Sequence, residues 1–594
     1  MKVYLTQIKM TLRLTMRNRI ALVFGYFFPL IFFFLFGSLM GKGNTGAASQ
    51  IVAMVLSIGV LGAGFFGASL QAVMSREQNI LRRFKVAPIS PAPILVSAMV
   101  GSLVNYMPMA LLVLALAHQM YGMPWPKELL SLLAFTALGV VAFVSLGNVI
   151  AAVVNSMQEA TIVTQLFYMP MLFLGGATIP LAILPAWVQT IAQFLPSTYF
   201  MSGMQNLVRG RETLRDNMPA IGALLLATAV GMLLAFKLFR WEKEEKMRPQ
   251  AKLWIVAVFA PFLVMGVWQT QAKTNLERAK LLQRDLARGR THLIHDARIF
   301  VGDGRVIERG SVLVQDGKIA KIFEGDGPDA KAVNANLIEA AGKTLLPELI
   351  DTRVRLSSSG LLTPDSNLDA AIDRELAAYL YSGVTAVRTM GDDPVVLQQH
   401  REAIQSGAKL GAELFIGNST TVLGIALASS EALEAFQHKS EEPLNRALVR
   451  QVIPAKMLDQ AKETLRSSET PRPPIFSLEA VKKTLKTAYD TDATLALGSG
   501  SGSILLVHGP AVHRELQLWV EAGVTTAAAL QAATYNAARL LKAESRIGRV
   551  QEGLEANLLL VDGNPLEQIS STEHIVTVLF KGERIDRTEL FEQK

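Results

Sequence analysis

The segment "LLPELIDTRVRL" (345–356) contains two closely spaced arginines that could bind a ligand. Arg353 and Arg355 alternate with a valine, so on a strand both side chains would leave the same face. Arginine stays protonated and has no lone pair for a metal, but two guanidinium groups could bind a carboxylate or a phosphate. The alternative, which we favour, is that both arginines face solvent or pair with nearby aspartates such as Asp351 or Asp392.

Side chains that ligate metals are scarce in the rest of the chain. His400 lies in "LQQHREAI" and His438 in "EAFQHKSEE", both polar helix contexts that favour a surface position. The absence of cysteine excludes disulfides and thiolate metal sites. The sequence also lacks a Gly-x4-Gly-Lys-Ser/Thr loop, so we expect this chain itself to bind no ATP and no other cofactor.

Half of the 594 residues are hydrophobic, and six apolar stretches fill the first 240 residues. They lie near residues 20–40, 51–74, 92–118, 129–154, 161–183 and 218–238. Each is long enough for a helix that crosses the hydrocarbon core, which takes about 20 residues. "GAGFFG" (62–67) lies inside the second stretch, where its small residues favour close helix packing over nucleotide binding. We therefore expect an all-α, six-helix membrane domain over residues 1–246.

Basic residues are concentrated in this membrane half. Lys and Arg outnumber Asp and Glu by 18 to 8 in residues 1–246, against 40 to 42 in the remainder. With the N-terminus inside, the inner segments hold fourteen Lys and Arg and the outer loops hold five. This bias places both ends of the six-helix unit in the cytoplasm and accounts for the basic charge without a nucleic-acid partner.

The loop "SREQNILRRFKVAPISPAPIL" (75–95) joins the second and third expected spans. Together with "LFYMPMLFLGGATIPLAILPAWVQTIAQFLPSTYFMSGMQNLVRG" (166–210) and "FKLFRWEKEEK" (236–246), it resembles the permease subunit of an ABC-2 type transporter over about residues 1–245. The residues of the loop that fit that family's pattern are Arg76, Glu77, Leu81, Arg83, Pro88, Ser90 and Pro91. Asn79 and Ile80 depart from it, because Gly and Thr are usual at these two positions.

The resemblance implies partners for the membrane half. It implies that a separate ABC ATPase subunit binds the ATP, and that two permeases pair in the lipid of the plasma (inner) membrane as a homodimer or a heterodimer. The residues expected to dock the ATPase are Arg76, Glu77, Arg82, Arg83 and Pro88. The alternative for this loop is a solvated basic segment that touches anionic lipid headgroups.

A seventh apolar stretch, "MRPQAKLWIVAVFAPFLVMGVWQTQA" (247–272), has the basic start, apolar core and small-residue end of a signal peptide. As a further membrane helix it would carry everything after it out of the cytoplasm, which is the placement we expect. The basic residues in the following segment, an expected linker at 273–290, argue against that placement. The sequence thus favours a multi-pass protein with an extracytoplasmic C-terminal domain.

From residue 291 the sequence alternates short β-prone runs with Asp-Gly turns, and then strands with helices. "LIDT" (349–352), "GVT" (383–385), "HRELQLWVEAG" (513–523) and "LLLVDGNPL" (558–566) occur in the order of the metal-dependent amidohydrolases of the imidazolonepropionase kind, which residues 291–590 resemble. The resemblance implies an α/β domain with a TIM-like (β/α) barrel. A composite β-sandwich is expected from 291–346 and 546–594, and an incomplete barrel, short by about a hundred residues, from 347–545.

The residues of that family's metal site are replaced in this sequence. The resemblance implies histidine ligands at the positions of Arg353 and Arg355, and an aspartate just after "LALG" (495–498), where Ser499 and Gly500 stand. His508 and His513 match other residues of the family and do not rebuild the site. We therefore expect no catalytic and no metal-binding residues in this domain.

Four functions remain open at this point. The first, which we favour, is the permease subunit of an ABC-2 exporter with a fused, inactive amidohydrolase-like domain. The second is a membrane-anchored hydrolase of carbon–nitrogen bonds in amides or peptides, which would need zinc. The third is a ligand-binding remnant tethered to a permease. The fourth is a decaying product whose truncated barrel exposes strand edges.

Overall fold

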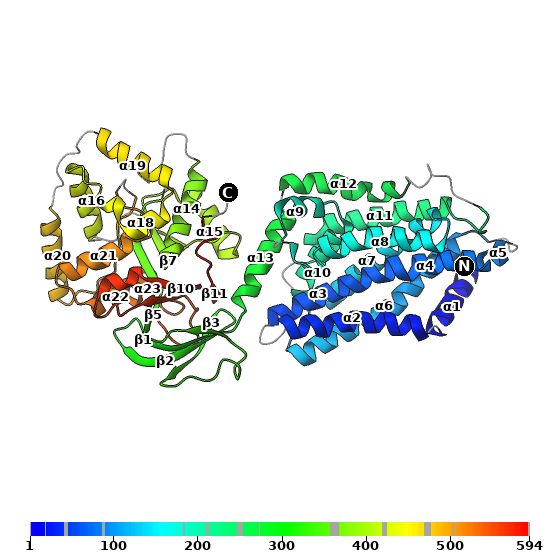
Figure 1. Cartoon of the computed structure of the whole chain (residues 1–594), viewed down its shortest axis with the longest axis horizontal. Helices are drawn as coiled ribbons and strands as arrows, with labels where there is room; N and C mark the ends of the chain where they lie inside the picture. Colours follow the sequence, from blue (N-terminus) through cyan, green and yellow to red (C-terminus); the bar gives the residue numbers. More distant parts are fainter. Residues whose placement is uncertain are drawn as a thin grey trace. The chain divides into compact units, whose positions relative to one another are not determined.

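The computed structural model describes residues 2–17, 19–40, 45–85, 89–181, 184–209, 213–245, 254–272, 274–356, 367–417, 425–468, 477–502 and 505–591. The chain divides into two compact units, Met1–Leu286 and Ala287–Lys594, and each is described by itself. The first unit is helical and the second combines strands with helices (Figure 1).

Every apolar stretch expected to span the membrane contains a helix. The elements of this region are α1 (Lys2–Arg17), α2 (Arg19–Met40), α3 (Thr45–Gly62), the π-helical turn η1 (Ala63–Ala68), α4 (Ser69–Glu77), α5 (Ile80–Lys85), α6 (Ala92–Tyr121), α7 (Leu129–Val153), α8 (Met157–Leu174), α9 (Ala186–Ala192), α10 (Pro196–Arg209), η3 (Arg215–Asn217), α11 (Met218–Lys237), α12 (Trp254–Ala272) and α13 (Thr274–Arg288). The segment 273–290, expected to be a linker, thus contains helix α13.

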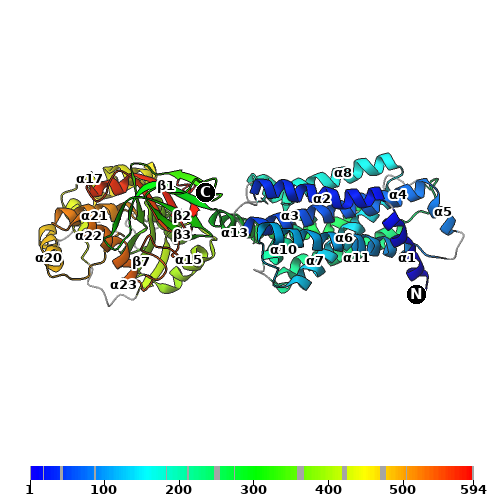
Figure 2. The same cartoon turned by 90° about the horizontal axis from the view of Figure 1, so that it is seen from below.

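Four helical segments are long and apolar enough to cross a membrane, judged by length and composition over the described residues. They are Ala47–Glu77, Ala92–Tyr121, Leu129–Val153 and Arg215–Lys237. The first of them combines α3, η1 and α4 into one nearly continuous helix. Helices of the first unit run side by side as a bundle (Figure 2).

Helix α7 lies at the centre of this bundle and packs against α6, α11 and η1. Its contact with η1 depends on glycine, because a Cβ atom on Gly147 would lie 2.2 Å from the carbonyl oxygen of Gly64. A Cβ atom on Gly64 would in turn lie 2.5 Å from the backbone of Phe143. The interpretation of "GAGFFG" as a close helix-packing segment is therefore confirmed.

In the second unit, a sheet joins strands from the beginning and the end of that unit. Its strands are β1 (His292–Phe300), β2 (Val306–Gln315), β3 (Lys318–Glu324), β4 (Asn336–Glu339), β5 (Lys343–Pro347), β9 (Leu558–Asp562), β10 (Ile575–Phe580) and β11 (Glu583–Arg584). They are ordered β11-β10-β9-β5-β1-β2-β3, with β4 paired to β1. The antiparallel pair of β5 and β9 is the seam between the early and late strands.

A second, parallel sheet has the order β6-β7-β8, formed by β6 (Leu349–Val354), β7 (Val384–Met390) and β8 (Glu413–Gly417). A single parallel bridge between Val354 and Ser501 extends it on the β6 side. The helices of this unit are α14 (Leu368–Tyr381), α15 (Pro394–Ser406), α16 (Leu427–Gln437), α17 (Glu442–Asn445), α18 (Ala447–Val452), α19 (Ala455–Ser467), α20 (Leu478–Asp490), α21 (Pro510–Glu521), α22 (Thr526–Ala533), α23 (Tyr535–Leu540) and the 3₁₀ turn η5 (Ile569–Glu573).

Candidate functional site

Arg76, at the end of α4, points into the helical unit rather than out of it. Its side chain is buried, and its two terminal nitrogens donate hydrogen bonds to the carbonyl oxygens of Ala151 (2.8 Å) and Val154 (2.6 Å). The last carbonyls of a helix have no partner within the helix, so the guanidinium group caps the carboxyl end of α7. Arg240 completes this cap by donating to Ala152 (2.9 Å) and to Val154.

Glu77 binds the first turn of the next helix. Its carboxylate accepts a hydrogen bond from the backbone N–H of Met157 at 2.7 Å, where α8 begins. The hydroxyl of Ser156 accepts from the N–H of Glu159, and the Glu159 carboxylate accepts from the N–H of Asn155, close to a capping box. Arg76 and Glu77 therefore tie the end of α4 to the junction between α7 and α8.

The short helix α5 carries the exposed part of the expected docking loop. The Arg82 side chain is 61% exposed and lies 3.7 Å from the Glu242 carboxylate. Arg83 is exposed as well, and Pro88 lies outside the described residues. Asn79 has a φ of +56°, a left-handed conformation in which Asn is tolerated and for which Gly is the usual residue.

The residues at the replaced metal positions lie around the carboxyl end of β6. Arg353 is half-buried and Arg355 is exposed. Gly500 has a φ of +70°, and its N–H donates to the carbonyl of Arg353 at 2.9 Å. Arginine and glycine side chains offer no lone pair to zinc, so these three positions do not fit the metal that the family resemblance implies.

A buried polar cluster lies beside them, around the Asp351 carboxylate. This carboxylate accepts hydrogen bonds from the Ser499 backbone N–H (2.9 Å), from the Ser499 hydroxyl and from the Arg353 N–H (3.2 Å). The hydroxyls of Ser501 and Tyr379 bond to each other, and the Ser501 hydroxyl also bonds to that of Ser499. Burial raises the pKa of Asp351 to about 6, although the bonds from Ser499 oppose the shift.

Replacing Asp351 with Asn is expected to remove a pH dependence from the second unit. Between pH ~4 and pH ~6 the folded chain keeps a proton on Asp351 that the unfolded chain has released, so rising pH destabilises the fold. The free energy of unfolding is expected to fall by about 3 kcal/mol across this range, at about 1.4 kcal/mol for each pH unit. Hydrogen exchange of β6 peptides in the full chain, corrected for intrinsic pH effects, measures it. Equal slopes for the wild type and Asp351→Asn would contradict the assignment.

The histidines do not assemble into a metal site in the described part of the chain. No group of three or more His, Asp and Glu side chains there is close enough to hold a metal ion. The expected surface position of His400 is wrong, because it is buried between Asp373 (2.7 Å) and Asp369 (3.1 Å). His438 is exposed, as expected.

His508 and His513 are both buried and bonded to the backbone. A ring nitrogen of His508 lies 2.8 Å from the carbonyl oxygen of Arg355, and one of His513 lies 2.8 Å from that of Ser382. Burial lowers the pKa of His513, which favours its neutral form. Both side chains hold loops in place.

Glu515 is a buried carboxylate that the sequence did not single out. It accepts hydrogen bonds from the N–H groups of Leu427 (3.0 Å) and Ala428 (2.6 Å) and from the indole N–H of Trp519 (2.8 Å). Ala426, at the N-cap of α16, has no side chain that can cap the helix, so Glu515 on α21 supplies the acceptor. The helical spacing in "HRELQLWVEAG" gives no signal for the cap of α16, because Leu427 and Ala428 lie 88 and 87 positions before Glu515.

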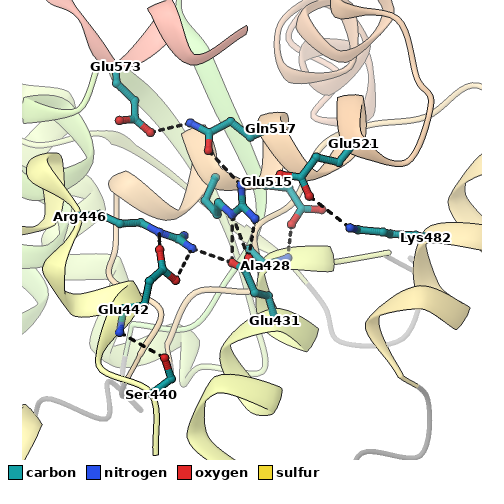
Figure 3. A network of polar contacts seen from close by, with 11 residues as sticks. Ala428, Glu431, Ser440, Glu442, Arg446, Lys482, Glu515, Gln517, Glu521 and Glu573 are labelled. Carbon is teal, nitrogen blue, oxygen red and sulfur yellow. Dashed lines mark hydrogen bonds and ion pairs between the residues drawn. The ribbon is translucent and has the colours of Figure 1, made fainter. Parts of the chain in front are cut away.

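Glu431 lies in a network of polar contacts with residues of several helices (Figure 3). Arg514, the neighbour of Glu515 on α21, belongs to this network. Its guanidinium group contacts both carboxylate oxygens of Glu431 and donates to Glu521 at 2.8 Å. Arg446 bonds to Glu431 and to Glu442, both at 3.1 Å. The network joins α16, α17 and α21 and has the character of a structural brace.

Comparisons with known proteins match a part of each half to a protein family. The model of the ABC-2 type transporter family matches residues 3–208, and that of the amidohydrolase family matches residues 478–585. The "Probable multidrug ABC transporter permease YbhR" of Escherichia coli (strain K12) is 27% identical over 192 residues, which are 32% of this chain and 51% of that protein. The chain thus spans about half the length of this relative.

Two Bacillus subtilis (strain 168) proteins are also similar. The linearmycin resistance permease protein LnrN is 25% identical over 175 residues, 29% of this chain and 45% of its own. The "Putative transport permease YvfS" is 23% identical over 236 residues, 39% of this chain and 93% of its own. Among solved structures, a Xaa-Pro dipeptidase with bound methionine overlaps 50% of this chain and 99% of its own, at 18% identity and a TM-score of 0.38. Molinate hydrolase overlaps 52% and 97%, at 17% identity and a TM-score of 0.40.

Proposed function

Because the chain joins an ABC-2 membrane domain to an amidohydrolase-family domain, we propose that it is the permease subunit of an ABC-2 type exporter, powered by a separate ATPase subunit. The permease relatives and the apolar helices make it a multi-pass membrane protein. The proposal includes a second permease, identical or different, in the plasma (inner) membrane. It also places the C-terminal domain outside the cytoplasm.

The observation that carries the ATPase proposal is that the residues at the end of α4 are bonded to the bundle, whereas those of α5 are exposed. Arg76 and Glu77 anchor the loop to the α7–α8 junction, while α5 presents Arg82 and Arg83 to solvent. Helix α5 is basic and exposed, and it follows two residues bonded to the bundle. A partner that binds α5 could therefore transmit its movement to the bundle. We therefore assign the direct contact with the ATPase to Arg82 and Arg83, and the transmission of its movement to Arg76 and Glu77.

Co-purification of the full chain from its native membrane tests this function. We expect an ABC ATPase in stoichiometric amount with the wild type, and its loss when Arg82 and Arg83 are both replaced by Glu. Lys127→Glu, a charge reversal at an exposed residue between α6 and α7, is the matched control and is expected to keep the ATPase. Retention of the ATPase by the double variant would refute the assignment of α5.

For the C-terminal half, we propose an amidohydrolase-like domain that has lost its metal ligands and does not hydrolyse substrates. The proposal is supported by Arg353, Arg355 and Gly500, which supply no donor where the family resemblance expects ligands. The competing function, a zinc-dependent hydrolase of carbon–nitrogen bonds, predicts bound metal. Metal analysis of the purified full chain decides between them, since about one zinc per chain would overturn our proposal.

A further inference from the structure

A bulge in β6 bears on the direction of Arg353, which lies on the strand, and of Arg355, which follows it. Asp351 pairs with Val387, yet Val354 pairs with Thr389, so three steps on β6 match two steps on β7. Laterally paired residues in a sheet share a face, and so Asp351 and Val354 both lie on the side of α14. Tyr379 of α14 reaches Asp351 there, and Val354 belongs to the same buried apolar cluster as the α14 side chains.

Arg353 and Arg355 consequently leave the opposite face of the sheet, away from the Asp351 carboxylate. On β7, Arg388 lies between Val387 and Thr389 and therefore shares this face. The pairing of Val354 with Thr389 makes Arg353 and Arg388 lateral neighbours on strands that run about 4.8 Å apart. Three arginine side chains thus leave the same face of the sheet near the carboxyl ends of β6 and β7.

The same face is apolar nearer the start of the strands. Ile350 and Ala386 pack there against Ala537 and Ala538 of α23. The side chains change from apolar to cationic only where the strands end, which is the end at which proteins with parallel β/α units bind their ligands. The arginines therefore lie at the strand ends where such proteins bind ligands, next to the apolar cluster packed against α23.

The charges of Arg355 and Arg388 are poorly compensated. In the part of the chain that the structure describes, neither Arg355 nor Arg388 forms an ion pair, and one terminal nitrogen of Arg388 is buried without a hydrogen-bond partner. A buried N–H without an acceptor is costly, so a hydrogen-bond acceptor at this nitrogen would be stabilising. The carboxylate of Asp392, just after β7 in the chain, accepts a hydrogen bond from the N–H of Leu356 at 3.1 Å.

Glycine leaves space beside two of the arginines. The Nε atom of Arg388 lies 2.7 Å from where a Cβ atom of Gly417 would stand, at the end of β8. The Nε atom of Arg355 lies 4.0 Å from the corresponding position on Gly391. Any larger residue at 417 would displace the Arg388 side chain.

We propose that Arg353, Arg355 and Arg388 form a binding site for an oxyanion, the carboxylate or phosphate group of a small molecule. Planar guanidinium groups bind such oxygens in pairs of parallel hydrogen bonds, and an anion would satisfy the buried nitrogen of Arg388. Fixed cationic side chains would then bind a ligand where the family resemblance expects a metal. The inference rests on the second unit alone and stands whether or not the ATPase proposal is correct.

Calorimetric titration of the purified full chain tests the site, with inorganic phosphate in one arm and acetate in the other, at constant ionic strength in chloride buffer. We expect saturable binding of at least one anion, and binding that is weaker by about tenfold or more in Arg388→Gln and in Arg355→Gln. Binding in one arm alone tells a phosphate site from a carboxylate site.

The control is Arg298→Gln, which removes the same charge from an arginine on β1 that pairs with Glu308. Its binding is expected to equal that of the wild type. Because Arg355 is exposed, Arg355→Gln is expected to fold even if Arg388→Gln does not. The inference is overturned if neither anion binds, if Arg355→Gln binds like the wild type, or if Arg298→Gln weakens binding equally.

Discussion

Replacing Arg76 with Ala is expected to deplete the folded protein from the membrane, although sequence resemblance alone would assign this residue to ATPase docking. The substitution removes two hydrogen bonds from a buried guanidinium group and leaves the carbonyls of Ala151 and Val154 poorly capped. Hydrogen bonds to a charged group contribute about 1.5–3 kcal/mol each, so we expect a loss of about 3–5 kcal/mol. Thermal unfolding in detergent and the amount of protein in the membrane fraction measure it.

Arg83→Ala is the control for this experiment, because Arg83 lies in the same loop but is exposed. It is expected to leave the unfolding temperature unchanged. Arg76→Lys is expected to be intermediate, since one ammonium group cannot reproduce the fork that spans both carbonyls. If Arg76→Ala is as stable as Arg83→Ala, the cap contributes nothing and the inward position of Arg76 has no structural consequence.

Glu515→Ala is expected to cause the largest loss of stability in the second unit. It deprives three N–H donors of their acceptor, two at the start of α16 and one on Trp519, and it leaves a cavity. Unsatisfied buried donors cost about 1–3 kcal/mol each, so a loss of about 3–5 kcal/mol is a modest expectation. Hydrogen exchange of α16 and α21 peptides in the full chain reports it, and Glu463→Ala, which removes an exposed glutamate on α19, is the control.

The ionisation of Glu515 adds a pH signature to this prediction. Burial raises its pKa to about 8, against the opposing bonds from Ala428 and Leu427. From pH ~4.5 to pH ~8 the folded chain keeps a proton that the unfolded chain has released, so the protection of α16 is expected to fall as pH rises. Glu515→Gln cannot ionise and is expected to lack this fall. A parallel decline in both proteins would contradict the assignment.

The helical segments could be predicted from sequence because their information is local. An apolar run of about 20 residues can bury its backbone polar groups in lipid only as a helix, whatever its neighbours are. The small residues of "GAGFFG" likewise predict close helix packing, although they do not identify Gly147 as the partner. Lengths and compositions of this kind need no knowledge of distant contacts.

The direction of individual side chains could not be predicted, because it depends on residues far along the chain. Arg76 points inward because carbonyls 75 and 78 positions later lie within its reach. Alternation predicts that Arg353 and Arg355 share a face, but only the pairing with β7 shows that a bulge separates Asp351 from the strand end. The expectation for His400 failed for a similar reason, since its aspartate partners lie on a different helix, α14.

The pairing of β5 with β9 can form only late in biosynthesis, because β9 is synthesised long after β5. The Thr344 hydroxyl, on β5, donates to the carbonyl of Gly563, a residue synthesised 219 positions later. At roughly 5–20 residues per second, the ribosome needs about ten seconds or more to deliver the second strand of this pair. During that time one edge of β5 has no partner and could pair with a neighbouring nascent chain. A premature stop before residue 558 would make this vulnerable state permanent.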